Sequence, residues 1–328
     1  MPQPDSKALV VQGPLANVSV QYKNQDYVGD RLLPIIDTDD PKIKITRYVK
    51  GAWFRDEAGI RAPGQQAKRG GYLVDFVGIA TKEFAYAKEV TDEDRRFANS
   101  IFGPVLRPDQ DALEFSADKI DLSKEGRIAA LLIATNFSGA GAGGEDAAGL
   151  WAPNDSTNTF VEDVETRIET IRGSTGMRPN GLMLSANTYS KIKQITTVQN
   201  RIAYVERAII TPNVIAALFQ LQEVLVAGAI RSSAVEKKDG TDFTAVNIWE
   251  NTATKGAAFL YYRHPTVGPK VPLVGAQVRL RYESGLPRRT STWREEASHQ
   301  DVYEVAEETD IVITGTDLGF WWKDTILT

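Results

Sequence analysis

Residues 108–136 constrain the fold most, because they form one long helical pattern, which only Gly126 interrupts. Pro108 and Asp109 suit a helix start, where a fixed φ angle and a carboxylate near unpaired N–H groups are favoured. Apolar residues at intervals of three and four, or multiples of them, form one stripe, whose core we expect to be Leu113, Ile120, Ile128 and Leu131. A second stripe lies beside it: Phe115, Leu122, Ala129 and Ile133. An ordinary core helix fits this pattern, but two stripes on a helix about 40 Å long favour a spine with a layer packed on each side.

The composition excludes several classes of protein. A chain of 328 residues with 42% hydrophobic residues can bury the cores of two or three modest domains. No apolar run approaches the roughly 18 residues of a membrane span, and the first residues lack the order of a signal peptide. We therefore expect a soluble, non-secreted protein with no membrane partner.

Residues that carry chemistry are scarce. The chain has no cysteine, which excludes disulfides and thiolate sites, and only two histidines. His264 follows an apolar run and is expected to be structural, and His299 lies in an acidic stretch and is expected in a solvated loop. Gly139, Gly141 and Gly144 match G-x-G-x-x-G, but they follow a helix, so we interpret them as a flexible linker. We predict no catalytic site, metal or cofactor, and no enzymatic activity.

The formal net charge of −5 argues against sequence-specific binding of duplex DNA. A wall that only faces nucleic acid needs no net positive charge, so proximity to DNA stays open.

Residues 42–90 predict a long two-stranded hairpin. Residues 42–54 alternate between apolar and polar side chains, and residues 72–90 form the returning strand. The polar segment between them carries a charged tip with six candidate contact residues: Arg55, Asp56, Glu57, Arg61, Lys68 and Arg69. A lone ribbon is marginal in water, so it must pack on its own chain or cross a neighbouring subunit. We favour the neighbouring subunit.

Residues 159–270 predict an α/β layer domain, because helical patterns alternate with short apolar strands. Thr159 and Glu162 are spaced as a capping box, and Gly173 is placed to end that helix. Pro212 suits the first position of a later helix. Thr211 is the candidate cap of that helix, and two further helix starts have a candidate cap, Thr91 and Ser185.

Taken together, the predicted organisation has five parts. They are an N-terminal arm (1–40), an extended-loop hairpin (41–90), a peripheral domain with the spine helix (91–158), an axial domain (159–270) and a strand-rich return to the peripheral domain (271–328). The aromatic run Phe320, Trp321 and Trp322 is expected to be buried.

This order of parts resembles the major capsid protein of tailed bacteriophages, an α+β protein with the HK97-like capsid fold that encapsulin shells share. The stretch VTDEDRRFANSIFGP looks like the approach to the spine helix of that family. The residues from TFVEDVETRIET to ANTYSKIKQ are similar to the opening of its axial domain. Two later segments, RIAYVERAIITPNVIAALFQLQEVLVAGAI and NIWENTATKGAAFLYYRHP, resemble the elements that follow, and the likeness covers roughly residues 30–285.

The resemblance implies a shell subunit that assembles with itself into hexamers and pentamers of an icosahedral phage head around double-stranded DNA. The expected location is the virion, with assembly in the host cytoplasm. A portal, a separate scaffold protein and a decoration protein are the partners that the resemblance implies. Lys68 lies in the loop where some relatives form covalent cross-links, but no partner residue can be named.

Two alternatives stay open from sequence alone. An encapsulin-type cargo shell has the same fold, and nucleic acid inside purified particles would distinguish the two. An α/β enzyme of unknown chemistry would need a pocket with convergent titratable groups.

Overall fold

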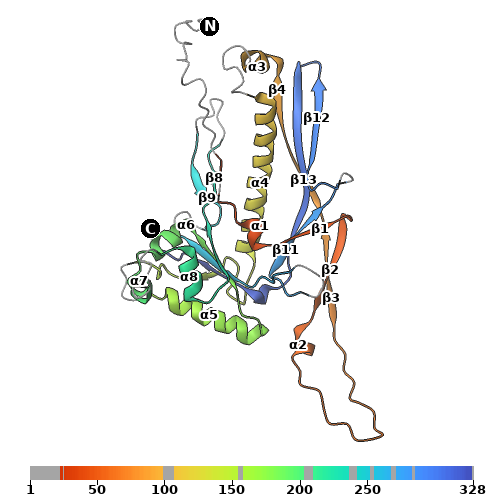
Figure 1. The fold of residues 1–328 in the computed structure, drawn as a ribbon, viewed down its shortest axis with the longest axis vertical. Helices are drawn as coiled ribbons and strands as arrows, with labels where there is room; N and C mark the ends of the chain where they lie inside the picture. Colours follow the sequence, from red (N-terminus) through yellow and green to blue (C-terminus); the bar gives the residue numbers. More distant parts are fainter. Residues whose placement is uncertain are drawn as a thin grey trace.

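The computed structural model describes residues 23–24, 26–98, 107–153, 158–202, 210–235, 242–251, 255–266, 271–282 and 285–326. Two sheets, each of five strands in this part of the chain, are joined by one long helix, and a thin ribbon projects away from both (Figure 1). The predicted α+β architecture is therefore observed.

The peripheral sheet is built mostly from the C-terminal third of the chain. Its order is β1 (Ile35–Thr38), β11 (Gly275–Leu280), β13 (Gln300–Ile313) and β12 (Arg289–Glu295), with β4 (Lys82–Thr91) on the other edge of β13. Strand β13 is long enough to pair with three strands, and ten of its residues face β4 in antiparallel register. The sheet thus joins segments that lie more than 200 residues apart.

Helix α4 (Pro108–Ala134) is the predicted spine, and it ends two residues earlier than expected. It packs against β4 and β13 along the peripheral sheet (Figure 1). Ile120 and Ile128 are buried as predicted, but Leu113 and Leu131 are only half-buried. Leu132, outside both predicted stripes, is fully buried, because the face that meets the axial domain is rotated by one residue from the expected one.

The axial sheet has the order β5 (Glu145–Asp146), β14 (Gly319–Lys323), β10 (Ala257–Tyr261), β6 (Gly181–Ser185) and β7 (Glu223–Ala227). Its two faces support two separate cores, because successive side chains of a strand point to opposite sides. Four helices lie in this part of the chain: α5 (Phe160–Thr175), α6 (Ala186–Ile192), α7 (Thr196–Ile202) and α8 (Pro212–Leu218).

The aromatic run near the end of the chain is buried, as predicted, and it contributes side chains to both axial cores. Phe320 and Trp322 belong to the core that includes helix α5, whereas Trp321 belongs to the core shared with Ile128 and Leu132 of helix α4. The spine helix and α5 therefore lie on opposite faces of one sheet.

Strand β14 corrects the prediction that residues 271–328 return only to the peripheral domain. Its backbone pairs with β10 and β5 of the axial sheet, whereas β11, β12 and β13 do lie in the peripheral sheet. The short 3₁₀ helix η4 (Thr316–Leu318) precedes this strand.

The predicted hairpin is shorter than expected. Strands β2 (Lys42–Tyr48) and β3 (Val74–Ala80) pair in antiparallel register, and the short helix α2 (Lys50–Trp53) replaces the end of the first predicted strand. Strand β4, which was predicted to belong to the hairpin, pairs with β13 instead. Alternation alone cannot separate β3 from β4, because both strands alternate and differ only in their partners.

The predicted N-terminal arm is partly wrong. Residues 1–22 and 25 lie outside the described residues, but those that follow are built into the body. Helix α1 (Gly29–Leu32) packs on α4, and strand β1 pairs in parallel with β11. Gly29 permits this approach, because a Cβ there would lie 2.6 Å from the Oε2 atom of Glu125.

Two predicted helix signals also need correction. Thr159 and Glu162 form no capping box, because the Thr159 hydroxyl donates to the carboxylate of Asp163 at 2.6 Å. Helix α5 passes through Gly173 and ends at Thr175, and the next residue, Gly176, has a positive φ of 72°, which suits the residue after a helix. Thr91, which precedes helix α3 (Asp92–Phe97), and Ser185 do accept the predicted capping bonds.

The other capping predictions have mixed outcomes. Pro212 is the first residue of helix α8 as predicted, although the side chain of Thr211 makes no capping bond.

The glycine-rich segment after the spine is held in place and is not a free linker. Gly143 donates its N–H to the carbonyl of Ile133, and Asn251 donates to the carbonyl of Gly143. Gly144 has a φ of 84°, and a Cβ there would lie 2.4 Å from the ring of Trp321. Close packing of the backbone on this tryptophan therefore requires a glycine at position 144.

Candidate assembly surfaces

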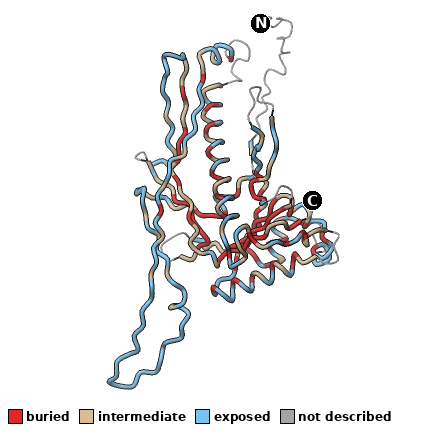
Figure 2. Tube along the Cα trace, turned by 180° about the vertical axis from the view of Figure 1, so that it is seen from behind, coloured by how far each residue is buried: buried red, intermediate tan, exposed pale blue. Residues whose placement is uncertain are grey.

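The hairpin ribbon is supported only at its base, where Ile43, Ile45 and Val77 pack on the peripheral sheet. Every residue from Trp53 to Leu73 is exposed, and Figure 2 shows this loop as one exposed tube beyond the body. Near its base, the Lys50 amine donates to the carboxylate of Asp317 at 2.5 Å and to the carbonyl of Ser174. These bonds tie the ribbon to the axial part of the chain beside its base.

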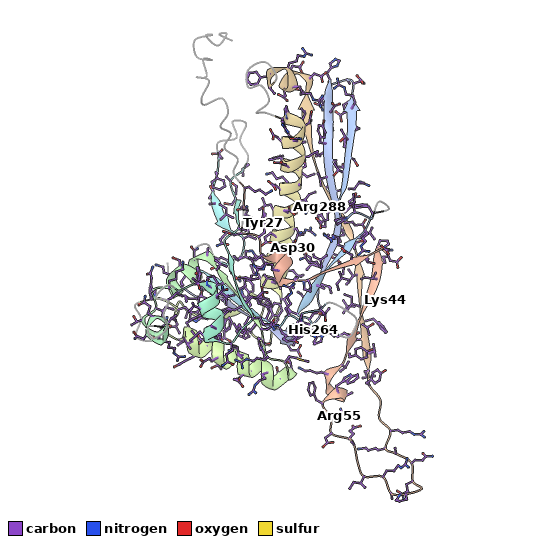
Figure 3. The ribbon with its side chains drawn as sticks, viewed as in Figure 1. Tyr27, Asp30, Lys44, Arg55, His264 and Arg288 are labelled. Carbon is purple, nitrogen blue, oxygen red and sulfur yellow. The ribbon has the colours of Figure 1, made fainter. Side chains whose placement is uncertain are left out.

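The six predicted tip residues all lie on this exposed loop, and Figure 3 places Arg55 near its beginning. These six residues are Arg55, Asp56, Glu57, Arg61, Lys68 and Arg69. None of the six forms an ion pair with another described residue. Exposed charges without partners suit contacts that form only in an assembly. Their role between subunits stays a prediction.

An aromatic group at the base of the ribbon was not predicted. We call it the neck cluster and define it as Tyr48, Trp53 and Tyr72. The ring centroids of its three pairs lie 5.6–5.8 Å apart, within the range of favourable aromatic contacts. The cluster brings residues from both sides of the exposed loop together.

Charge is distributed unevenly along the molecule. Residues 41–80 carry eight basic and three acidic side chains, a formal charge of +5, on a chain whose total is −5. We call residues 82–125 and 289–310 the peripheral arm, which carries nine basic and eighteen acidic side chains, a formal charge of −9. The ribbon and the distal end of this arm lie at opposite ends of the molecule (Figure 1).

A buried carboxylate joins the spine helix to two other segments. Glu125 of α4 is 2% exposed and accepts hydrogen bonds from the backbone N–H groups of Val28 at 2.8 Å and Gly29 at 3.0 Å. The indole N–H of Trp249, from the axial part of the chain, donates to the same carboxylate at 2.8 Å. Burial raises the pKa of Glu125, and the three donors offset only part of that effect. This junction links the N-terminal segment, the spine and the axial core.

Ion pairs on the same helix connect the spine to its neighbours. Lys124 is paired with Asp30 at 2.9 Å, and Asp30 lies beside the spine in Figure 3. Arg288 bridges Asp121 of the spine and the buried Glu307 of β13. Burial alone would lower the pKa of Arg288, but these two carboxylates raise it overall. The spine is therefore held by charged contacts on two sides as well as by apolar packing.

The described residues contain no group of three or more potential metal ligands, and none of their helices is long and apolar enough to cross a membrane. His264 follows β10 and its ring Nδ1 lies 2.9 Å from the carbonyl oxygen of Thr266. His299 lies in the exposed turn before β13, where its carbonyl accepts from the N–H of Asp92. His264 is thus held by local contacts, and His299 lies in an exposed turn as predicted.

Two sheets on one spine helix, with a projecting ribbon, define the HK97-like fold of phage capsid subunits. A curated relative, the major capsid protein of Burkholderia phage BcepMu, is 24% identical over 245 residues, which cover 74% of this chain and 76% of the relative. A phage-related protein from Bordetella bronchiseptica, solved by crystallography, is 22% identical, with a TM-score of 0.64 over 94% of both chains.

A capsid chain of the cyanophage P-SCSP1u has a TM-score of 0.61 at 11% identity, over 98% of this chain and 95% of that one. No model of a known protein family matches the sequence. The resemblance and the fold class predicted from the sequence are thus confirmed.

Sequence reasoning found the exposed ribbon and the spine but missed the neck cluster and the Glu125 junction. Tyr48 and Tyr72 lie 24 residues apart, and only the pairing of β2 with β3 brings them together. The donors to Glu125 lie about a hundred residues away in either direction, so no local pattern could reveal them.

Proposed function

We propose that this chain is a major capsid protein, the subunit that assembles with itself into the shell of an icosahedral phage head around double-stranded DNA. The observation that carries the proposal is the shared fold over nearly the whole length of phage capsid chains, together with the curated relative of that name. The role is structural and not enzymatic.

The shape of the subunit supports this role. A shell needs flat bodies that tile and extended parts that bridge them. The two sheets on the spine provide the body, and the exposed loop of the ribbon provides a segment that projects beyond it. In the assembled shell, the ribbon crosses the neighbouring subunit of the same hexamer or pentamer, and residues 159–270 point to the centre of that capsomer.

The proposed partners follow from the same role. Copies of this chain are the principal partner, and a portal and a separate scaffold protein join them during assembly in the host cytoplasm. A decoration protein is a further candidate. The net negative charge fits a wall that faces packaged DNA without binding its sequence.

The test is assembly of the purified full chain, observed by electron microscopy, compared with a variant in which a short glycine-serine turn replaces residues 56–71. The parent chain should form closed particles, alone or with its scaffold protein. The variant should remain folded, because the replaced residues are all exposed, but it should fail to close shells. Normal particles from the variant would count against the ribbon tip as the bridge.

The contents of purified phage-derived particles separate the two shell classes. Double-stranded DNA inside them supports the phage head. Particles that hold a protein cargo and no DNA would favour an encapsulin-type shell, which has the same fold.

A further inference from the structure

The exposed apolar side chains of the molecule are concentrated on the ribbon. Of the sixteen exposed large apolar side chains among the described residues, seven lie between Val49 and Phe76. Trp53 is 61% exposed, and Phe54, Leu73 and Phe76 of the same segment have similar or greater exposure. Exposed apolar side chains gathered on one segment favour a site of interaction.

The neck cluster is arranged in advance for binding. Its three rings pack on one another, and Lys50, three residues before Trp53, is fixed to Asp317 of the axial part. Ring contacts reduce the side-chain freedom that binding would otherwise remove, which favours affinity. Tryptophan and tyrosine are also the residues that most often dominate binding energy at interfaces.

Charge identifies the partner surface. The ribbon segment has a formal charge of +5, and the peripheral arm, at the opposite end of the molecule, has −9. Glu93, Asp111 and Glu114 of that arm are exposed and form no ion pair with another described residue. Complementary charges at the two ends of one molecule favour head-to-tail contact between copies, and such contacts close into rings when the rotation permits.

We propose that the neck cluster is the apolar anchor by which the ribbon of one copy docks on the acidic peripheral arm of the next copy. This inference rests on the proposed shell function and assigns a specific role to three residues within it. The anchor supplies most of the affinity, since exposed ion pairs contribute little. The basic ribbon supplies orientation and speeds the encounter, so assembly should slow as salt rises.

Tryptophan fluorescence can test the anchor directly. The chain has six tryptophans, of which only Trp53 and Trp293 are exposed. Because Trp293 lies on strand β12 of the peripheral arm, it is left unchanged. Acrylamide quenching of the full-length parent is compared with that of a Trp53→Phe variant, and the difference should report the accessibility of Trp53. Quenching of Trp53 should be strong in unassembled subunits and should fall, in particles, to the level of the four buried tryptophans.

A second measurement compares substitutions matched in exposure. Trp53→Ala should raise the critical concentration for assembly about tenfold or more, as expected for an interface hot spot, with little change in subunit melting temperature. Phe243→Ala removes an aromatic ring that is 65% exposed and lies outside both the ribbon and the peripheral arm, so it should change neither quantity. Tyr72→Ala should act in the same direction as Trp53→Ala.

The outcomes separate this inference from the shell function. Particles in which Trp53 stays accessible, or a Trp53→Ala variant that assembles like the parent, would overturn the anchor and leave the shell function intact. A parent chain that forms no particles under any condition, with or without a scaffold protein, would refute the shell function and the anchor together.

Discussion

Glu125 gives the sharpest test of how the subunit is held together. Its Oε1 atom accepts from Val28 and Trp249, and its Oε2 atom accepts only from Gly29. In a Glu125→Gln variant, the amide oxygen can keep both bonds at the first position, but the NH₂ group must face the N–H of Gly29. One buried donor is then left unpaired, which costs about 1–3 kcal/mol of unfolding free energy.

A Glu125→Leu variant extends the same reasoning. Leucine has a similar size but accepts no hydrogen bond, so all three buried donors lose their partner. The loss should therefore be about three times that of the glutamine variant, within the usual departures from additivity. Adding Trp249→Phe to the leucine variant removes one of the stranded donors, so the double variant should lose less than the sum of its two single losses.

Urea denaturation of unassembled subunits, followed by tryptophan fluorescence and circular dichroism, measures these differences. Glu114→Gln is the matched control, because this glutamate lies on the same helix with its side chain in solvent. It should change stability by less than about 0.5 kcal/mol. The reasoning fails if Glu125→Gln is as harmless as the control, or if Glu125→Leu costs no more than Glu125→Gln.

Two further predictions follow from burial and charge. Leu132→Asp should unfold the subunit, since it buries an unpaired charge. Leu131→Asp, at the half-buried neighbouring position, should lower the melting temperature less. Equal decreases in melting temperature for the two variants would contradict the observed buried face of the helix. The bonds from Arg294 hold the pKa of Asp92 at about 2, below the ordinary value of about 3.9. Asp92 therefore stabilises the fold at pH values above its ordinary pKa and loses that contribution as the pH falls toward 2. In an Asp92→Asn variant, the unfolding free energy should fall less steeply between about pH 4 and pH 2 than in the parent. An unchanged slope in this pH range would contradict the pairing of Asp92 with Arg294.

The spine helix was predictable because its signals are local. Proline at the start and a periodicity of three and four are written into consecutive residues, and the structure places helix α4 within two residues of the prediction. The buried face was less accessible to prediction. Leu131 and Leu132 are adjacent leucines, and only the position of the axial core decides which of them is buried.

The strands show where local patterns stop being sufficient. Strands β3 and β4 are separated by a single residue, yet they enter different sheets because β13, more than 200 residues later, pairs with only one of them. The same limit explains why strand β14 was assigned to the wrong sheet. Pairing over such separations depends on the whole topology, which neither propensity nor alternation encodes.

The position of strand β14 in the axial sheet has a consequence for biosynthesis. Strands β6, β7 and β10 leave the ribosome first, but the gap between β10 and β5 is filled only when residues 319–323 have been made. Two tryptophans that complete the opposing cores arrive with that strand. The axial sheet of the nascent polypeptide therefore cannot be completed until residues 319–323 have left the ribosome, well after its other strands.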